Sequence, residues 1–121
     1  MKKDSTHRIK SYEDACKNQN RPVLTLADFA WAGDDQVRAF SNHCIDIICD
    51  AMREGIVFDY TNWDQQKWEI LWQFVPGSGW VLDDVLYADT YTLVGARRSF
   101  ISKKHAQYFA KQFQALYNAA Q

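Results

Sequence analysis

The sequence has no long uninterrupted hydrophobic run, and no stretch approaches the ~18 apolar residues that a transmembrane helix needs. Residues 1–10 begin with basic side chains, but no apolar stretch follows, so we expect neither a membrane span nor a secretory leader. The three cysteines, Cys16, Cys44 and Cys49, are odd in number and lack the paired spacing of a disulfide framework. We therefore expect reduced thiols and a cytoplasmic location.

Motifs of the common catalytic sites are also missing. The chain contains no glycine-rich phosphate loop, no Gly-x-Ser-x-Gly elbow, no CxxC pair and no His-Glu-x-x-His sequence. His43, Asp46 and Asp50 share one polar face of a predicted helix, where they could ligate a metal or act as an acid–base pair. Because no motif supports that chemistry, we interpret the face as solvated. We expect no catalytic residue, no metal and no cofactor, and hence a non-enzymatic protein.

Aromatic residues are abundant by contrast, at 15% of the chain. Hydrophobic residues at 47% and charged residues at 24% are typical of a globular protein. A length of 121 residues without repeat, low-complexity segment or linker indicates one domain, residues 1–121. Because aromatic side chains bury large areas, a chain of this composition can build a compact core from few positions.

The net charge of −1 conceals an uneven distribution. Residues 1–21 carry a net +3, residues 22–95 carry a net −9, and residues 96–121 contain no acid. We interpret this pattern as basic ends packed beside an acidic middle, with a binding face as the alternative. The basic residues of the last segment are Arg97, Arg98, Lys103, Lys104 and Lys111.

Three segments have helical patterns. A short helix is predicted over residues 12–18. Ser11 directly before it and Asp14 in its first turn are the hydroxyl and the acid of a capping box. Apolar residues recur at three- and four-residue steps over residues 35–53 and again over residues 103–119, as in amphipathic helices. We expect residues 22–35 to cover the core as an irregular segment, with a short strand or helical turn as the alternative.

The region between the two longer helices predicts strands. Aromatic and polar residues alternate over residues 67–75, a Pro-Gly-Ser-Gly turn follows, and a β-rich run covers residues 80–87. A third β-prone run lies at residues 93–101. We therefore predict an α+β fold in the order α-α-β-β-β-α. Its antiparallel sheet of about three strands is packed by the two longer helices, with the short N-terminal helix at an edge.

Four of the five tryptophans lie between Asn62 and Trp80. Trp68 and Trp72 fall on one face of the predicted first strand, so we expect them to fill the core and not to form a stacking platform for bases. Trp63 lies in a predicted turn beside Asp64, where it could act as a lid or an anchor.

Three phrases in the chain resemble a known family: IKSYEDACK, TNWDQQKWEILWQF and TYTLVGARRSFISKKHAQYFAKQFQALY. They are similar to small uncharacterised proteins carried by bacteriophages and mobile elements of gut bacteria. The resemblance follows the whole chain in order, although this chain departs at residues 98–101 and has a longer irregular segment at residues 29–33. It implies a phage-like setting and brings no activity with it.

The sequence thus favours a structural or regulatory interaction protein with a protein partner, and self-association is open. The alternative is a nucleic-acid-binding protein that uses the basic C-terminal patch and aromatic residues. The candidate binding surface comprises Trp63, Asp64, Arg97, Arg98, Lys103 and Lys104.

Overall fold

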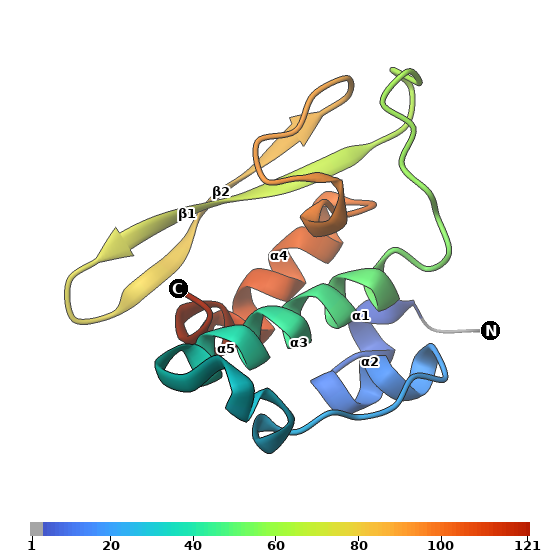
Figure 1. The fold of residues 1–121 in the computed structure, drawn as a ribbon. Coiled ribbons are helices and arrows are strands. Elements are labelled where there is room, and N and C mark those ends of the chain that lie inside the picture. Colours follow the sequence, from blue (N-terminus) through green and yellow to red (C-terminus); the bar gives the residue numbers. More distant parts are fainter. Residues whose placement is uncertain (1–3) are drawn as a thin grey trace.

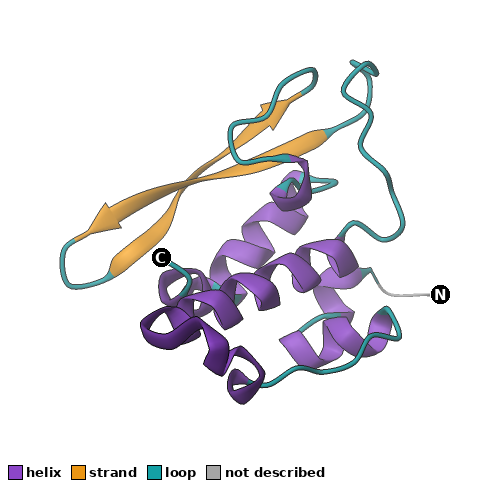
Figure 2. Cartoon of the chain, viewed as in Figure 1, coloured by secondary structure: helices purple, strands orange, loops and turns teal. Residues whose placement is uncertain are grey.

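The computed structural model of the chain describes residues 4–121, and Figure 1 shows how its elements follow one another. Figure 2 separates a body of helices from a single two-stranded ribbon, so the fold is α+β. The elements are α1 (Ser5–Arg8), α2 (Tyr12–Asn18), η1 (Leu26–Asp35), α3 (Gln36–Met52), β1 (Lys67–Val75), β2 (Gly79–Ala88), η2 (Ala96–Arg98), α4 (Lys103–Gln112) and α5 (Gln114–Ala119).

Helix α2 confirms the predicted N-terminal helix and its start. The Ser11 side chain accepts the N–H of Asp14 at 3.1 Å, as the capping pattern requires. Its small apolar face, Tyr12, Ala15 and Cys16, is buried. Residues 22–35 contain 3-10 turns that begin with a reciprocal Thr25–Asp28 cap. The aromatic rings of this stretch do not all cover the core, since Trp31 is 77% exposed.

Helix α3 is the centre of the helical body, and its bounds confirm the predicted long helix. Every apolar residue from Cys44 to Met52 is buried, while Val37 in the first turn is exposed. Ile45 and Ile48 are almost fully buried, and each such side chain contributes about 1.5–3 kcal/mol by leaving water. One buried cluster runs from Ile9 through α2, α3 and the ribbon to α4 and Ala120.

The ribbon confirms the predicted hairpin. β1 pairs antiparallel with β2, from Lys67 opposite Ala88 to Val75 opposite Gly79, with a bulge that places two β2 residues, Asp83 and Asp84, beside the Leu71–Trp72 step. Figure 1 shows the ribbon laid across α4, with its turn extending past the C-terminal helices. Only the half of the ribbon that lies over the helices therefore has a buried face.

The predicted third strand is not present as a strand, so the sheet has two strands where we expected three. Residues 93–101 form a loop with the short η2, and one bridge between Phe100 and Trp68 is all that remains of the pairing. The reason lies in Glu69, whose carboxylate accepts the N–H of Leu93 at 2.9 Å. Gly95 then turns the chain at φ 91°, so the backbone leaves the sheet direction.

The predicted C-terminal helix is divided in two. Phe113 adopts φ −116° and ψ 23°, outside the helical region, and separates α4 from α5. The change of direction places Tyr117 and Asn118 of α5 against the ribbon. Among the helices of residues 4–121, none is both long and apolar enough to cross a membrane.

Candidate functional site

The pair Arg97–Arg98 of η2 does not form a free basic patch, because both side chains lie against the polar face of α3. Arg97 donates from Nη2 to Asp50 at 2.9 Å. Arg21 donates to the same carboxylate at 3.2 Å, and Arg53 donates to its other oxygen. Asp50 therefore lies among three guanidinium groups, and its side chain is only 11% exposed.

Asp46, one helical turn earlier, holds the second arginine. Arg98 donates from Nε to Asp46 at 2.9 Å and from Nη2 to the Asn42 side-chain oxygen at 2.9 Å. Arg97 also approaches Asp46 at 3.9 Å. Four arginines thus surround two aspartates, which leaves this cluster with a net charge of +2.

Electrostatics fix the ionised form of the cluster. Burial pushes the pKa of Asp50 up, but the hydrogen bonds from Arg97 and Arg53 outweigh it and hold the pKa below the usual range. The hydrogen bond to Asp50 raises the pKa of Arg97 in turn. The polar face that we expected to be solvated is therefore an ion-pair surface. Within the described residues, no group of three or more His, Cys, Asp or Glu side chains is arranged to hold a metal.

His43 does not join the two aspartates. Its Nε2 lies 3.1 Å from the Tyr12 hydroxyl, which accepts the N–H of Leu24 at 3.0 Å. Burial lowers the pKa of His43 and raises the pKa of Tyr12 to about 12. The pair therefore connects α2, α3 and the segment before η1 as a neutral link.

The other predicted binding residues lie on separate elements. Lys104 of α4 forms an ion pair with Asp4 at 2.8 Å, and its hydrogen bond holds the Asp4 pKa well below the usual range. Lys103 is exposed beside it. Trp63, 71% exposed, and Asp64 lie in the loop before β1. The six residues therefore do not form one continuous surface.

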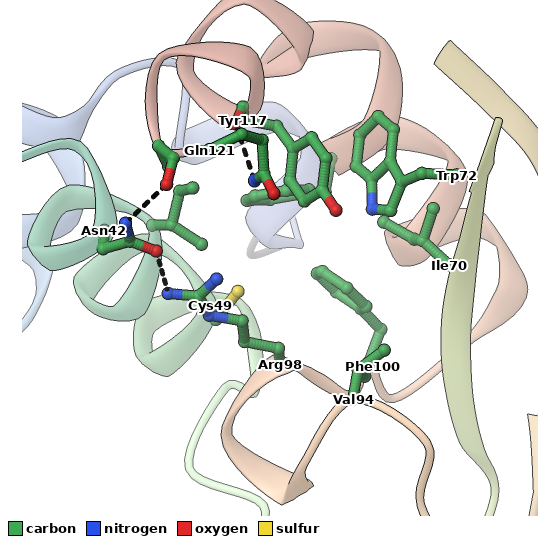
Figure 3. A pocket seen from close by; sticks show the side chains of 12 residues that line it. Asn42, Cys49, Ile70, Trp72, Val94, Arg98, Phe100, Tyr117 and Gln121 are labelled. Atoms are coloured by element: carbon green, nitrogen blue, oxygen red, sulfur yellow. Dashed lines mark hydrogen bonds between the residues drawn. The ribbon is translucent and has the colours of Figure 1, made fainter. Parts of the chain in front are cut away.

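A cavity of ≈ 240 Å³ lies between α3, the ribbon, and helices α4 and α5. Figure 3 shows the side chains around it, with Arg98 of η2 and Phe100 of the following loop on one side and Tyr117 and Trp72 on the other. Arg98 thus belongs both to the ion-pair cluster and to the cavity wall. The sequence singled out Arg98 and Trp72 separately, but no spacing in the sequence links them.

Tyr117 and Trp72 stack face to face, with ring centroids 3.9 Å apart and planes at 10°. The polar ends of both rings, the Tyr117 hydroxyl and the Trp72 Nε1, face the cavity in Figure 3. Burial raises the pKa of Tyr117, so the phenol keeps its proton. Trp68 and Trp72 are half-buried and pack against the core without filling it, so the prediction for them is confirmed in part.

Cys49 also borders the cavity, but it is not a nucleophile. Burial raises the pKa of its thiol to about 12, and the thiolate is the reactive form. Cys44, on the same helix, likewise has a pKa raised to about 12 by burial. Both side chains therefore act as small apolar core residues.

Two charged residues of β1 are buried, which was not predicted from the sequence. Lys67 is 0% exposed because the loop before the ribbon covers it. Glu69 is 1% exposed because the loop after the ribbon covers it. The Lys67 ammonium donates to the carbonyl of Asn62 at 2.9 Å and lies 5.1 Å from the Tyr60 ring centroid. Glu69 accepts from the Leu93 N–H and from the Thr92 and Ser99 hydroxyls. These two residues shape both loops.

A serine, a histidine and a glutamate form a hydrogen-bonded network at the start of α4. His105 lies 2.5 Å from the Ser102 hydroxyl and 2.7 Å from the Glu54 carboxylate, which also accepts from Ser5. Burial pushes the Glu54 pKa up, but these hydrogen bonds hold it below the usual range. Ser102 already caps α4 by accepting the His105 N–H. This network therefore links α1, the end of α3 and α4, and the Ser102 hydroxyl already accepts a hydrogen bond as the cap of α4.

The comparisons with known proteins contain no match: no protein-family model, no curated protein sequence and no solved structure resembles the chain at a significant level.

Proposed function

We propose that this chain is a non-enzymatic interaction protein that binds an extended segment of a partner protein along the outer edge of β1. The observation that carries the proposal is an unguarded strand edge next to exposed apolar side chains. The phage or mobile-element setting implied by the sequence phrases belongs to the same proposal and rests on those phrases alone.

The geometry of the ladder identifies which backbone groups are open. Trp68 uses its N–H and carbonyl for the bridge to Phe100, so these groups point away from β2. In an antiparallel pair this orientation recurs at every second residue. The N–H and carbonyl groups of Ile70, Trp72 and Phe74 therefore also point outward. Among the described residues, no hydrogen bond to the outward groups of Trp72 or Phe74 is present.

The two edges of the ribbon are protected unequally. The β2 edge carries the bulge with Asp83 and Asp84, and the Asn118 side chain pairs with the Trp80 backbone. Charges, bulges and covering groups are the usual devices that prevent edge pairing. The β1 edge from Leu71 to Val75 has no charged residue. Its contrast with β2 supports a binding role for this edge.

Exposed side chains beside that edge indicate the chemistry of the partner. Phe74 is 57% exposed and Leu71 is 42% exposed, one on each face of the ribbon. An added strand would place its alternate side chains beside both, as in recognition by strand addition. The partner segment is therefore expected to be extended and apolar on at least one face.

A library of extended decapeptide-sized probes tests the proposal, with binding measured by fluorescence anisotropy and by protection of the Trp72 and Phe74 amides. Phe74→Pro removes one outward N–H without breaking the β1–β2 ladder, so it should abolish binding. Phe74→Ala is the matched control, because it removes the same ring and keeps the N–H. It should weaken binding only several-fold.

The proposal is wrong if no probe protects these amides, or if the Phe74→Pro variant binds as well as Phe74→Ala. Sedimentation of the protein without any probe measures whether it self-associates. A dimer that Phe74→Pro dissociates would make a second copy of the chain the occupant of the edge, and it would overturn the proposed foreign partner.

Nucleic-acid binding through the basic C-terminal residues is the weaker proposal. Arg97 and Arg98 already have aspartate partners, and Lys104 has Asp4. A phosphate would have to compete with these carboxylates for the N–H groups that already donate to them.

A further inference from the structure

We propose that the cavity beside Arg98 is a binding site for a small organic carboxylate with an aromatic or branched apolar body. This site uses the side chains of Ile70 and Trp72, whereas the proposed edge uses their outward backbone groups, so it does not depend on the proposed function.

The size of the cavity limits the ligand. Its volume is ≈ 240 Å³. Since an apolar cavity of about 150 Å³ holds one benzene molecule, the present volume suits a compound of about ten non-hydrogen atoms. A nucleotide or a peptide is too large to be enclosed, so the ligand is a small metabolite-sized molecule.

The wall of the cavity requires an apolar body. Ile45, Ile70, Phe100 and Phe109 line it, and all four side chains are buried or nearly so. Water against these four side chains has few partners, and an apolar group that displaces it there gains the free energy of leaving water. The wall therefore favours a ring or a branched chain over a sugar or a polyol.

Polar groups at the same cavity determine the head group, and three of them are donors. Arg98 uses Nε and Nη2 for Asp46 and Asn42, while no group among residues 4–121 hydrogen-bonds its Nη1. The Tyr117 hydroxyl and the Trp72 Nε1 form no hydrogen bond with the other side chains drawn around the cavity in Figure 3. Figure 3 shows these three side chains around one gap. A ligand with acceptor oxygens would satisfy all three, whereas a ligand with donors could pair only with the Tyr117 hydroxyl.

Charge selects an anionic acceptor over a neutral one. The cluster to which Arg98 belongs has four arginines against two aspartates, a net +2. A carboxylate accepts charge-assisted hydrogen bonds from a guanidinium, and these are about twice as strong as neutral ones. Its apolar body would occupy the wall of Ile45, Ile70 and Phe109. The same three donors and the apolar wall therefore specify both ends of one small molecule.

Phenylacetate, with about ten non-hydrogen atoms, is the probe that matches this description. Phenylacetamide has the same shape without the charge, and phenethylamine reverses the charge. Titrations followed by ¹H–¹⁵N spectra should show phenylacetate shifting the Trp72 indole N–H, with a dissociation constant on the order of 0.1 mM. Phenylacetamide should bind about tenfold more weakly, and phenethylamine should not bind.

Two neighbouring arginines provide a matched pair of variants. Arg98→Gln should remove the preference for phenylacetate over phenylacetamide, because Arg98 borders the cavity. Arg97→Gln disturbs the same aspartates but lies outside the cavity wall, so it should keep the preference. Tyr117→Phe keeps the stack on Trp72 and loses only the hydroxyl, and it should weaken phenylacetate binding several-fold.

The proposal is overturned if phenylacetate and phenylacetamide bind equally well to the unmodified chain. Equal losses in Arg97→Gln and Arg98→Gln would overturn it too, as would no shift of the Trp72 indole signal up to about 10 mM phenylacetate. If the Arg98→Gln variant does not fold, as judged by a spectrum without dispersed signals, the affinity of Tyr117→Phe for phenylacetate tests the proposal instead. An unchanged affinity for phenylacetate in that variant contradicts the assigned donors.

Discussion

The side-chain amide of Asn118 pairs with the backbone of Trp80 as a neighbouring strand would. It accepts the Trp80 N–H at 2.7 Å and donates to the Trp80 carbonyl at 2.9 Å. Gly79 makes this approach feasible, because a Cβ at that position would lie 2.4 Å from the Asn118 oxygen. One side chain of α5 thereby ends the β2 edge and fixes the ribbon to the helices.

We expect Asn118→Ala to lower the free energy of unfolding by about 2 kcal/mol, because the half-buried Trp80 N–H and carbonyl lose both partners. Urea denaturation followed by tryptophan fluorescence measures the change. Gln121→Ala is the control, since the Gln121 amide bonds only to the Tyr117 carbonyl four residues earlier, and it should cost about 0.5 kcal/mol or less. Equal costs for both variants would contradict the role of Asn118.

Asp50→Asn should lower the free energy of unfolding by about 3 kcal/mol, because it leaves Arg21, Arg53 and Arg97 facing each other without their common carboxylate. Asp35→Asn is the matched control. Its ion pair with Arg38 is exposed on both sides, so its removal should cost well under about 1 kcal/mol. Chemical denaturation at low and high salt checks both, and a cost for Asp50→Asn as small as that of the control would refute the cluster as a structural centre.

The Glu69→Gln substitution should loosen residues 92–99 selectively. A neutral amide keeps the size of the carboxylate but replaces one acceptor by a donor that faces the Leu93 N–H or the Thr92 hydroxyl. Hydrogen exchange should become faster at Leu93 and Gly95, while α3 amides stay protected. Uniformly faster exchange over the whole chain would instead mean that Glu69 supports the entire core.

Stability should fall as the pH decreases below about 6.5, the ordinary pKa of histidine. Burial lowers the pKa of folded His43, so the unfolded chain binds its proton first, and the contribution of neutral His43 is complete only above that pH. Urea midpoints at about pH 7.5 and about pH 5.5 measure the loss. His43→Gln should flatten this window while leaving the acid-induced loss from Asp50 and Glu54, at lower pH, in place.

Single- and double-stranded oligonucleotides should bind no tighter than about 0.1 mM at about 50 mM salt, because the guanidinium groups of Arg97 and Arg98 are held by Asp50 and Asp46. Anisotropy titrations at increasing salt provide the measurement. Micromolar affinity that declines steeply with salt would restore the nucleic-acid alternative. In that case a Lys103→Gln variant would tell whether α4 carries the contact.

Periodic features of the sequence predicted α2, α3 and the hairpin well, whereas α1 was not predicted. Ser11 marked the start of α2, apolar spacing marked α3, and alternation marked β1, because each pattern reflects contacts within one element. The prediction of a third strand was wrong because the Leu93 N–H bonds to the Glu69 side chain, a contact that no local pattern contains. The break at Phe113 was missed for a similar reason, since the apolar stripe continues through it.

The candidate site was only partly visible in the sequence. The sequence pointed to Arg98 and to the α3 aspartates separately. Asp46 is 52 residues from Arg98, however, and no local pattern indicates that the two meet. The stacked pair of Trp72 and Tyr117 likewise combines a strand residue with one from a helix whose direction changes at Phe113. Such sites depend on the packing of distant elements, and single-sequence patterns do not contain that information.

The fastening of the ribbon by α5 also has a consequence for the order of events during synthesis. Trp72 and Trp80 emerge from the ribosome well before Tyr117 and Asn118, which complete their packing. A two-stranded hairpin without support is marginal in water. We therefore expect the nascent hairpin to remain without its helical support until residues 117–118 have emerged.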